Sequence, residues 1–249
     1  MPTLILLRHG QSEWNQQNLF TGWYDCGLTD TGIKEALQAG KLLHEAELIP
    51  DVTYSSLQKR AIQTAELVNQ SLNKKIPIHK NWRLNERHYG DLTGLNKSDA
   101  KLKFGEEKIQ EWRRGYNTPP PPISPENHFN PNRDEAYINV PKESIPLSEC
   151  LADVVDRLIP YWHSDIRPEL KSGKKVLIAA HGNSLRALCK HLDKIGDKEI
   201  VKLNIPTGMP FIYELDDELN PKIKKPVLER ALDPETARTQ AESVEKQTR

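Results

Sequence analysis

The sequence has few cysteines, no excess of charge of either sign and no long apolar run. Three cysteines, Cys26, Cys150 and Cys189, stand far apart in a chain of 249 residues. An odd number at wide spacing argues against a disulfide framework and for a reducing compartment. The N-terminus has no basic stretch before its short apolar run, and no segment approaches the ~20 apolar residues of a membrane span. We therefore expect a soluble, cytoplasmic protein without a membrane partner.

The charge balance excludes a second group of partners. The chain has 35 basic and 35 acidic residues, so its formal net charge is +0. Such a chain has no overall field that would attract nucleic acid or an anionic membrane, and any anion binding must be local. Hydrophobic residues make up 37%, which is low for a fully packed chain even when glycine is added. Part of the chain is therefore expected to lie outside the core.

Polar residues follow three short apolar runs, at the points where strands would end. The runs are Thr3 to Leu7, Asp51 to Tyr54 and Lys174 to Ala180, and they are followed by Arg8-His9, Ser55-Ser56 and His181-Gly182-Asn183. Short aliphatic runs are typical of buried strands, and the helical pattern after Ser56 adds Arg60. In open α/β sheets, ligands bind beyond the carboxyl ends of the strands. Parallel neighbours would bring two histidines and two arginines into one crevice.

This set of side chains favours a phosphate site. Guanidinium groups match phosphate oxygens and neutralise their charge. A neutral imidazole held beside them can attack phosphorus through one ring nitrogen if a hydrogen bond fixes the other. The chemistry indicated is phosphoryl transfer through a phosphohistidine. Two alternatives stay open here: loop residues that make only structural hydrogen bonds, and a metal site. Against the second, nothing places a third ligand at zinc spacing.

The remaining pattern predicts an α/β protein with parallel crossovers. We expect helices over Thr29 to Glu47, Glu106 to Arg114 and Leu147 to Trp162, and strands over Ile76 to Ile78 and Phe211 to Leu215. Residues 119–146 are rich in proline and are read as an excursion within a single catalytic domain, 1–220. The polar tail, 221–249, is expected to be disordered or loosely helical, with a flap over the site as the alternative.

Other candidate residues lie in polar, glycine-containing loops. Glu86 stands between Arg83 and Arg87, and near a bound phosphate it would be suited to proton transfer; by itself it could equally be a surface ion-pair partner. Thr21 and Gly22 belong to a loop that would form a wall of the site or simply pack. Arg113-Arg114 could hold a carboxylate or a second phosphate, or could be a solvated helix end.

Six segments carry a resemblance to a known family. They are LRHGQSEWN at Leu7, FTGWYDCGLTDTG at Phe20, SLQKRAIQT at Ser56, WRLNERHYGDLTGLNK at Trp82, EWRRGYNTPPP at Glu111 and AAHGNSLRAL at Ala179. In this order they resemble the cofactor-dependent phosphoglycerate mutases of the histidine phosphatase superfamily, over nearly the whole chain to about Asn220. The resemblance implies a three-layer αβα fold with a mostly parallel central sheet.

The resemblance also implies an activity and roles for residues. His9 would be the phosphorylated nucleophile, Glu86 the proton donor and acceptor, and His181 a stabiliser of the transferring group, with Arg8 and Arg60 completing the phosphate pocket. The substrate-binding residues would be Asn15, Thr21, Gly22, Tyr89, Lys97, Arg113, Arg114, Gly182 and Asn183. The family interconverts 3-phosphoglycerate and 2-phosphoglycerate in glycolysis and gluconeogenesis, uses 2,3-bisphosphoglycerate to prime the histidine, and needs no metal.

Some alternatives stay open beside this reading. They are a phosphohistidine-type phosphatase, a bisphosphoglycerate synthase and a phosphate-binding module without turnover. The resemblance argues against the synthase, because that branch of the family has serine where this chain has Gly22. It also implies a homodimer, although the family forms tetramers as well.

Overall fold

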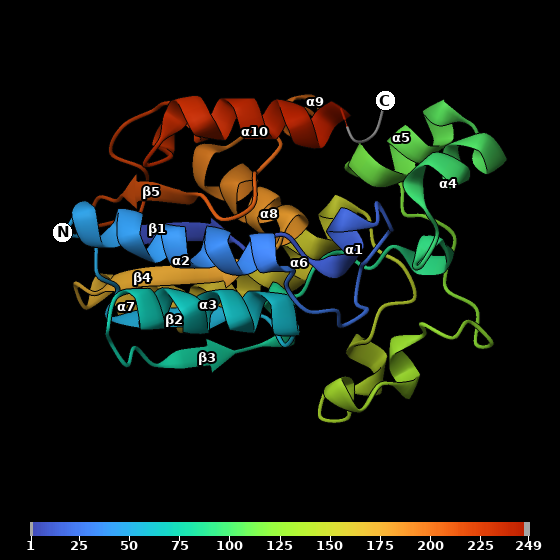
Figure 1. Ribbon diagram of the computed structural model, residues 1–249, viewed down its shortest axis with the longest axis horizontal. Coiled ribbons are helices and arrows are strands. Elements are labelled where there is room, and N and C mark those ends of the chain that lie inside the picture. The colour runs from blue at the N-terminus through green and yellow to red at the C-terminus, as the bar shows by residue number, and fades with distance from the viewer. Residues whose placement is uncertain (1, 247–249) are drawn as a thin grey trace.

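The computed structural model describes residues 2–246, which form a five-stranded sheet flanked by helices (Figure 1). The strands are β1 (Thr3–Arg8), β2 (Val52–Ser55), β3 (Ile78–Lys80), β4 (Lys175–Ala180) and β5 (Pro210–Glu214). Their spatial order is β3-β2-β4-β1-β5. The first four are parallel, and β5 runs antiparallel to β1. The prediction of a mostly parallel sheet is confirmed, and β5 is the exception to the expected parallel crossovers.

The helices lie on both faces of the sheet and beyond its carboxyl end. They are α1 (Glu13–Gln16), α2 (Asp30–Glu45), α3 (Lys59–Ser71), α4 (Lys97–Phe104), α5 (Glu106–Arg114), α6 (Leu151–Tyr161), α7 (Arg167–Lys171), α8 (Gly182–Asp193), α9 (Asp197–Ile200) and α10 (Pro234–Lys246). A π-helical turn, Trp162–Ile166, joins α6 to α7. Short 3-10 turns cover Trp82–Leu84, Gly90–Leu92, Pro131–Arg133, Glu135–Tyr137, Lys142–Ser144 and Val227–Arg230.

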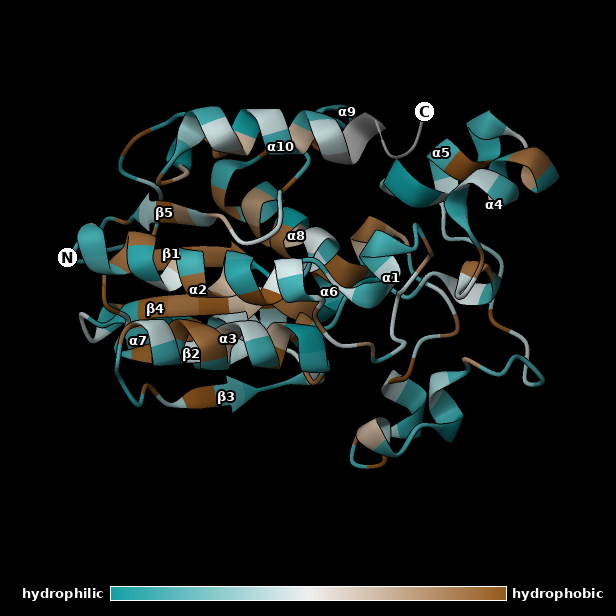
Figure 2. Ribbon diagram, in the orientation of Figure 1, coloured by the Kyte–Doolittle hydropathy of each residue, from teal (hydrophilic) through white to brown (hydrophobic). Residues whose placement is uncertain are grey.

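Alternation along β1 divides the core into two layers. Leu4 and Leu6 point to the face where α6 and α8 pack, whereas Ile5 and Leu7 point to the face covered by α2 and α3. Because successive strand residues face opposite sides, one fully apolar strand supplies both layers. Figure 2 shows β1 and β4 as hydrophobic strands between helices that also carry hydrophilic residues. The αβα arrangement is therefore confirmed.

Two elements begin at least two residues later than expected. The strand predicted at Ile76 to Ile78 begins at Ile78, because Pro77 has no N–H to donate and takes part only through its carbonyl, which accepts from the Thr53 N–H. The helix predicted from Leu147 begins at Leu151, after an N-terminal cap in which the Asp153 carboxylate accepts from the Cys150 N–H (2.8 Å).

The segments that were difficult to assign from the sequence have defined positions. In the proline-rich excursion, the buried Tyr137 hydroxyl donates to the Trp23 carbonyl at 2.6 Å, which ties the excursion to the loop after α1. The tail forms α10, whose Ala237 is fully buried in the main core. Residues 247–249 of the predicted tail lie outside the described residues. The division of the chain at residue 220 and the flap stay predictions.

Candidate active site

The two histidines predicted to converge lie side by side. Strand register aligns Arg8 of β1 with Ala180 of β4, and Ser55 of β2 with Ala179. The residues that follow these strands are thus neighbours at the carboxyl end of the sheet. The imidazole centroids of His9 and His181 are 5.0 Å apart, with their planes at 60°.

Local hydrogen bonding fixes the tautomer of His9. Its Nδ1 lies 2.6 Å from the Gly10 carbonyl oxygen, which can only accept, so Nδ1 carries the proton and Nε2 keeps its lone pair. Burial, followed by the charges of Arg60 and Arg8, lowers the pKa of His9 well below 6.5. The ring is therefore neutral near pH 7, as a nucleophile at Nε2 must be.

His181 is also held by a hydrogen bond from a neighbouring strand end. Its Nε2 lies 2.7 Å from the Ser56 hydroxyl oxygen, which in turn accepts from the Gln58 N–H at 3.1 Å. Its Nδ1 is buried and has no hydrogen-bond partner among the described residues. Burial and the charge of Arg60 lower the pKa of His181 well below 6.5. The neutral ring thus has one nitrogen left for a ligand.

Two arginines are fixed by backbone carbonyls. Arg60, near the start of α3, donates to the carbonyls of Tyr24 (2.9 Å) and Gly22 (3.0 Å). Arg8 donates to the Ile205 carbonyl at 2.7 Å, while its buried Nε has no partner in the described part of the chain. Guanidinium groups fixed in this way form a rigid positive cradle, and such a cradle stabilises charge that develops during a reaction.

Glu86 is buried beside this cradle and is not a surface carboxylate. It is 8% exposed, and its Oε1 accepts from the N–H groups of Arg87 (2.7 Å) and Asn183 (3.1 Å). The Glu86 N–H donates to the Gln58 side chain at 2.8 Å. A Cβ on Gly182 would come within 3.7 Å of both Glu86 Oε2 and the Arg8 guanidinium carbon. Glycine there leaves room for a ligand between the carboxylate and the cation.

Two adjoining cavities, each of about 60 Å³, form the cleft. Both are lined by Arg8, Glu86, Tyr89 and Arg113. The inner cavity adds His9, Asn15, Thr21, Arg60 and Lys97, and the outer cavity adds Arg114, Gly182, Asn183, Arg186 and Asn204. All predicted site residues except Gly22 and His181 line one of these cavities. Gly22 lies behind the inner cavity, where its carbonyl accepts from Arg60 and from Gln58.

The cleft is strongly positive. Burial and the nearby cations Arg113, Arg8 and Arg114 lower the pKa of Lys97 to about 7. Burial and Arg114 lower the pKa of Arg113, and of Arg186, to about 9. Within residues 2–246, the buried atoms Arg113 Nη1, Arg186 Nε and Asn204 Oδ1 have no hydrogen-bond partner. Cations this crowded and incompletely bonded indicate a polyanionic ligand.

The sequence interpretation missed several residues of the site. Arg186 could have been found, because it lies three residues after Asn183 on the same helix face and donates to its side-chain oxygen at 2.8 Å. Ser56 was noted only as a strand end. Asn204 lies in an irregular segment between α9 and β5, and no motif marks it.

Among residues 2–246, no group of three or more His, Cys, Asp or Glu side chains is placed to hold a metal ion. None of the helices described is long and apolar enough to cross a membrane.

Comparisons with known proteins agree with this geometry. Residues 4–220 match the model of the histidine phosphatase superfamily (branch 1). A protein of Rhodococcus jostii is 56% identical over 220 residues, which cover 88% of this chain and 87% of the relative. A protein of Streptomyces avermitilis is 52% identical over 245 residues, covering 98% and 96%. Both are named 2,3-bisphosphoglycerate-dependent phosphoglycerate mutase.

Solved structures show the same fold at lower identity. A mycobacterial glucosyl-3-phosphoglycerate phosphatase aligns with a TM-score of 0.68 at 20% identity, covering 88% of this chain and 96% of that one. Bacillus stearothermophilus YhfR aligns with a TM-score of 0.67 at 24% identity, covering 89% and 96%. At these identities the likeness concerns the fold alone.

Proposed function

The chain belongs to the histidine phosphatase superfamily, and we propose that it interconverts 3-phosphoglycerate and 2-phosphoglycerate as a 2,3-bisphosphoglycerate-dependent mutase. The observation that carries the proposal is a neutral His9, with its Nε2 lone pair free of a proton, in a cleft lined by six buried or partly buried cations. The near full-length identity to proteins of that name supports the mutase over the phosphatase and synthase alternatives.

His9 performs the covalent step. Its Nε2 lone pair forms a bond to phosphorus while the bond from phosphorus to the ester oxygen breaks, and the electrons of that bond go to the departing oxygen. Arg8 and Arg60 neutralise charge on the phosphoryl oxygens. His181, as a neutral donor 5.0 Å from His9 between ring centroids, stabilises the same group. The product of this half-reaction is phosphohistidine on His9.

Glu86 acts as the general acid and the general base of the reaction. Protonated, it donates to the departing ester oxygen; ionised, it accepts the proton of the sugar-acid hydroxyl that attacks phosphohistidine in the return step. It lies between the two cavities, so one carboxylate can serve hydroxyls at neighbouring carbons. The outer arginines, Arg113, Arg114 and Arg186, are suited to hold the carboxylate or the phosphate that does not react.

The primer fits the residues present. 2,3-Bisphosphoglycerate supplies the phosphoryl group that first loads His9. It carries three anionic groups, and the cleft offers partly unbonded cations in both cavities, so the charge and the extent of the site agree with such a ligand. The charge and the extent of the cleft also agree with phosphoglycerate, a small anionic molecule, as the substrate. The homodimer implied by the family resemblance stays a prediction, which light scattering of the purified chain checks.

A coupled assay tests the proposal. Isomerisation of 3-phosphoglycerate should depend on catalytic amounts of 2,3-bisphosphoglycerate, persist with a chelator present, and disappear in His9→Ala. Mass spectrometry should find acid-labile phosphate on His9 after exposure to the bisphosphate. Release of free phosphate without isomerisation would select the phosphatase instead. Binding of phosphoglycerate with neither reaction would select a binding module.

A further inference from the structure

The segment that carries Glu86 is buried but has little regular structure. It runs from the 3-10 turn Trp82–Leu84 to the turn Gly90–Leu92, and Asn85, Arg87 and His88 within it are at most 1% exposed. Buried backbone groups need hydrogen-bond partners, and outside a helix or a sheet these must come from side chains or other loops. The partners of this segment therefore determine where Glu86 lies.

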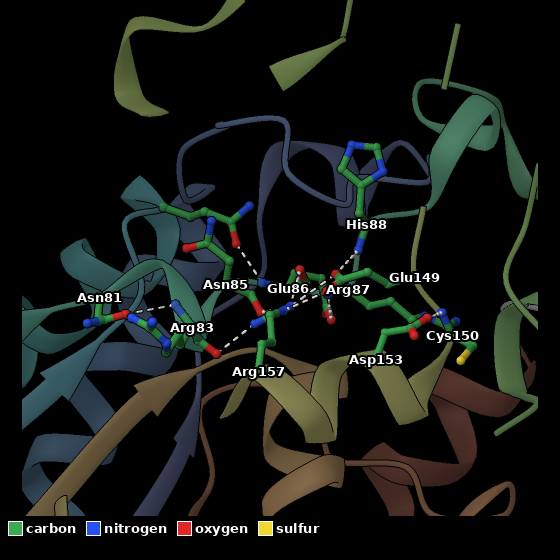
Figure 3. Close-up of polar contacts among 11 residues, drawn as sticks. Asn81, Arg83, Asn85, Glu86, Arg87, His88, Glu149, Cys150, Asp153 and Arg157 are labelled. Carbon is green, nitrogen blue, oxygen red and sulfur yellow. Dashed lines mark hydrogen bonds and ion pairs between the residues drawn. The ribbon is translucent and has the colours of Figure 1, made fainter. Parts of the chain in front are cut away.

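Arg157, on α6, supplies three of these partners. Its Nη1 donates to the Arg83 carbonyl at 2.6 Å, and its Nη2 donates to the carbonyls of Asn85 (2.9 Å) and Glu86 (3.1 Å). Figure 3 shows the Arg157 side chain reaching from α6 into the segment. A single planar guanidinium thus holds three carbonyls on both sides of the Glu86 amide.

Glu149 completes the arrangement from the other side. Its Oε1 accepts from Arg157 Nε at 2.6 Å and its Oε2 from Arg157 Nη2 at 3.1 Å. Its Oε2 also accepts from the His88 N–H at 2.8 Å, and the Glu149 N–H donates to the His88 carbonyl at 2.9 Å. The side chains of Arg157 and Glu149 are only 8% and 3% exposed. Both charged groups are therefore buried, and both bind the segment around Glu86 (Figure 3).

Stability alone does not account for such a pair. A buried ion pair often contributes no more to stability than packed apolar side chains of the same volume, because both charges lose their hydration. An apolar pair could not, however, bind three carbonyls and an N–H of an irregular segment. What Arg157 and Glu149 supply is a fixed backbone at residues 83–88.

We propose that the Arg157–Glu149 pair is a positioning device for Glu86, which sets the place of its carboxylate relative to the phosphoryl group on His9. The inference rests on the proposed proton-transfer role of Glu86. Among its described contacts, Arg157 touches no cavity-lining residue other than Glu86, so it acts through Glu86 and is not itself a catalytic residue.

The proposal predicts a separation of kcat from KM. Arg157→Lys keeps the charge but cannot reach three carbonyls, because an ammonium group lacks the guanidinium fork. A displacement of Glu86 by about 1 Å should lower kcat on the order of 100-fold. KM should change less than about twofold, because Arg8 and Arg60 are held by other carbonyls and continue to bind the substrate.

A double-mutant cycle tests whether Arg157 acts through Glu86. Single-turnover isomerisation by the full chain primed with 2,3-bisphosphoglycerate is measured for the wild type, Arg157→Lys, Glu86→Gln and the double variant. If the proposal is right, Arg157→Lys has almost no further effect once Glu86 is Gln. Loss of a general acid or base typically costs about 10²–10⁴-fold, so slow turnover in the Glu86→Gln background stays measurable over hours.

Leu158→Val is the matched control, because Leu158 is adjacent on α6 but is buried in the main core. It should lower the melting temperature and leave kcat unchanged.

Should Arg157→Lys fail to fold, Glu149→Gln takes its place in the cycle. An equal loss in both backgrounds, a rise in KM with unchanged kcat, or no effect of either variant overturns the positioning role. If Glu86→Gln has the same kcat as the wild type, Glu86 does not have the proposed proton-transfer role, and the basis of this inference is lost.

Discussion

At the scale of single residues, we expect Lys97 to link substrate binding to pH. Its pKa of about 7 follows from burial and from the charges of Arg113, Arg8 and Arg114. Above that pH an increasing fraction of the empty enzyme has a neutral Lys97, and the cleft loses one of its positive charges. We expect KM for 3-phosphoglycerate to rise about tenfold between pH 6.5 and 8.5. This rise corresponds to a loss of about 1.4 kcal/mol of binding free energy.

Two variants separate this effect from other titrations. Lys97→Arg keeps its charge over the whole range and should show a nearly flat KM. Lys97→Met has no charge at either pH, so its KM should be high and also nearly flat. Steady-state KM at several pH values, at constant ionic strength, is the measurement. The same pH dependence in all three proteins would show that another group is responsible.

Some site residues could be predicted from the sequence because each follows an apolar run. Arg8, His9 and His181 are fixed by the ends of β1 and β4, and parallel pairing brings such ends together without any knowledge of side-chain packing. Arg157 and Glu149 gave no such signal. They act from α6 and from the coil before it on a segment about 70 residues earlier in the chain, and that contact exists only in three dimensions.

At the scale of elements, the strands with continuous aliphatic runs could be predicted from the sequence, whereas the irregular segments could not. β1, β2 and β4 were expected within one residue or so of their observed bounds, because a continuous aliphatic run is a direct consequence of burial on both faces. β5 could be placed, but its antiparallel direction could not, since a strand's own residues do not fix the direction of its neighbour. The excursion at 119–146 depends on single contacts, such as Tyr137 with Trp23, which follow no period.

The helix α10 offers a prediction at this scale. It runs toward the side of the molecule where α4 and α5 lie (Figure 1). Its Ala237 packs in the core. A phosphohistidine that passes its group to a substrate hydroxyl must be shielded from water. If the tail shields it, a chain ending at Asp233 should hydrolyse phosphorylated His9 about tenfold faster relative to transfer, a barrier change of about 1.4 kcal/mol.

The ratio of hydrolysis to transfer is measured with phosphorylated enzyme, with and without 3-phosphoglycerate. A chain ending at Lys246, which keeps α10, is the control and should behave as the full chain does. The shorter chain should also melt earlier, because it loses the burial of Ala237. If only the melting temperature falls and the ratio stays the same, α10 has a structural role and does not cover the site.

At the scale of the whole molecule, buried neutral histidines make stability depend on pH. Burial, with a smaller effect from Arg157, lowers the pKa of His88 to about 3, and burial likewise lowers the pKa values of His9 and His181 well below 6.5. In the unfolded chain these imidazoles return to a pKa near 6.5 and bind protons as the pH falls below it. The folded state does not, so acid favours the unfolded state.

The sign and the size of this effect can both be tested. For His88, with a pKa of about 3 in the folded protein, the free energy of unfolding should fall by about 2 kcal/mol between pH 7.5 and pH 5. Urea unfolding at the two pH values measures this fall, in a buffer without phosphate or sulfate, because anions bound in the cleft would stabilise the folded state.

His88→Asn is the control variant, because its side chain cannot be protonated. Its amide oxygen replaces His88 Nδ1 as the acceptor for the Gly90 N–H, which lies 2.9 Å from Nδ1 in the wild type. Its loss of stability over the same range should be about 2 kcal/mol smaller than that of the wild type. Equal losses in the two proteins would mean that His88 does not stay neutral in the folded state.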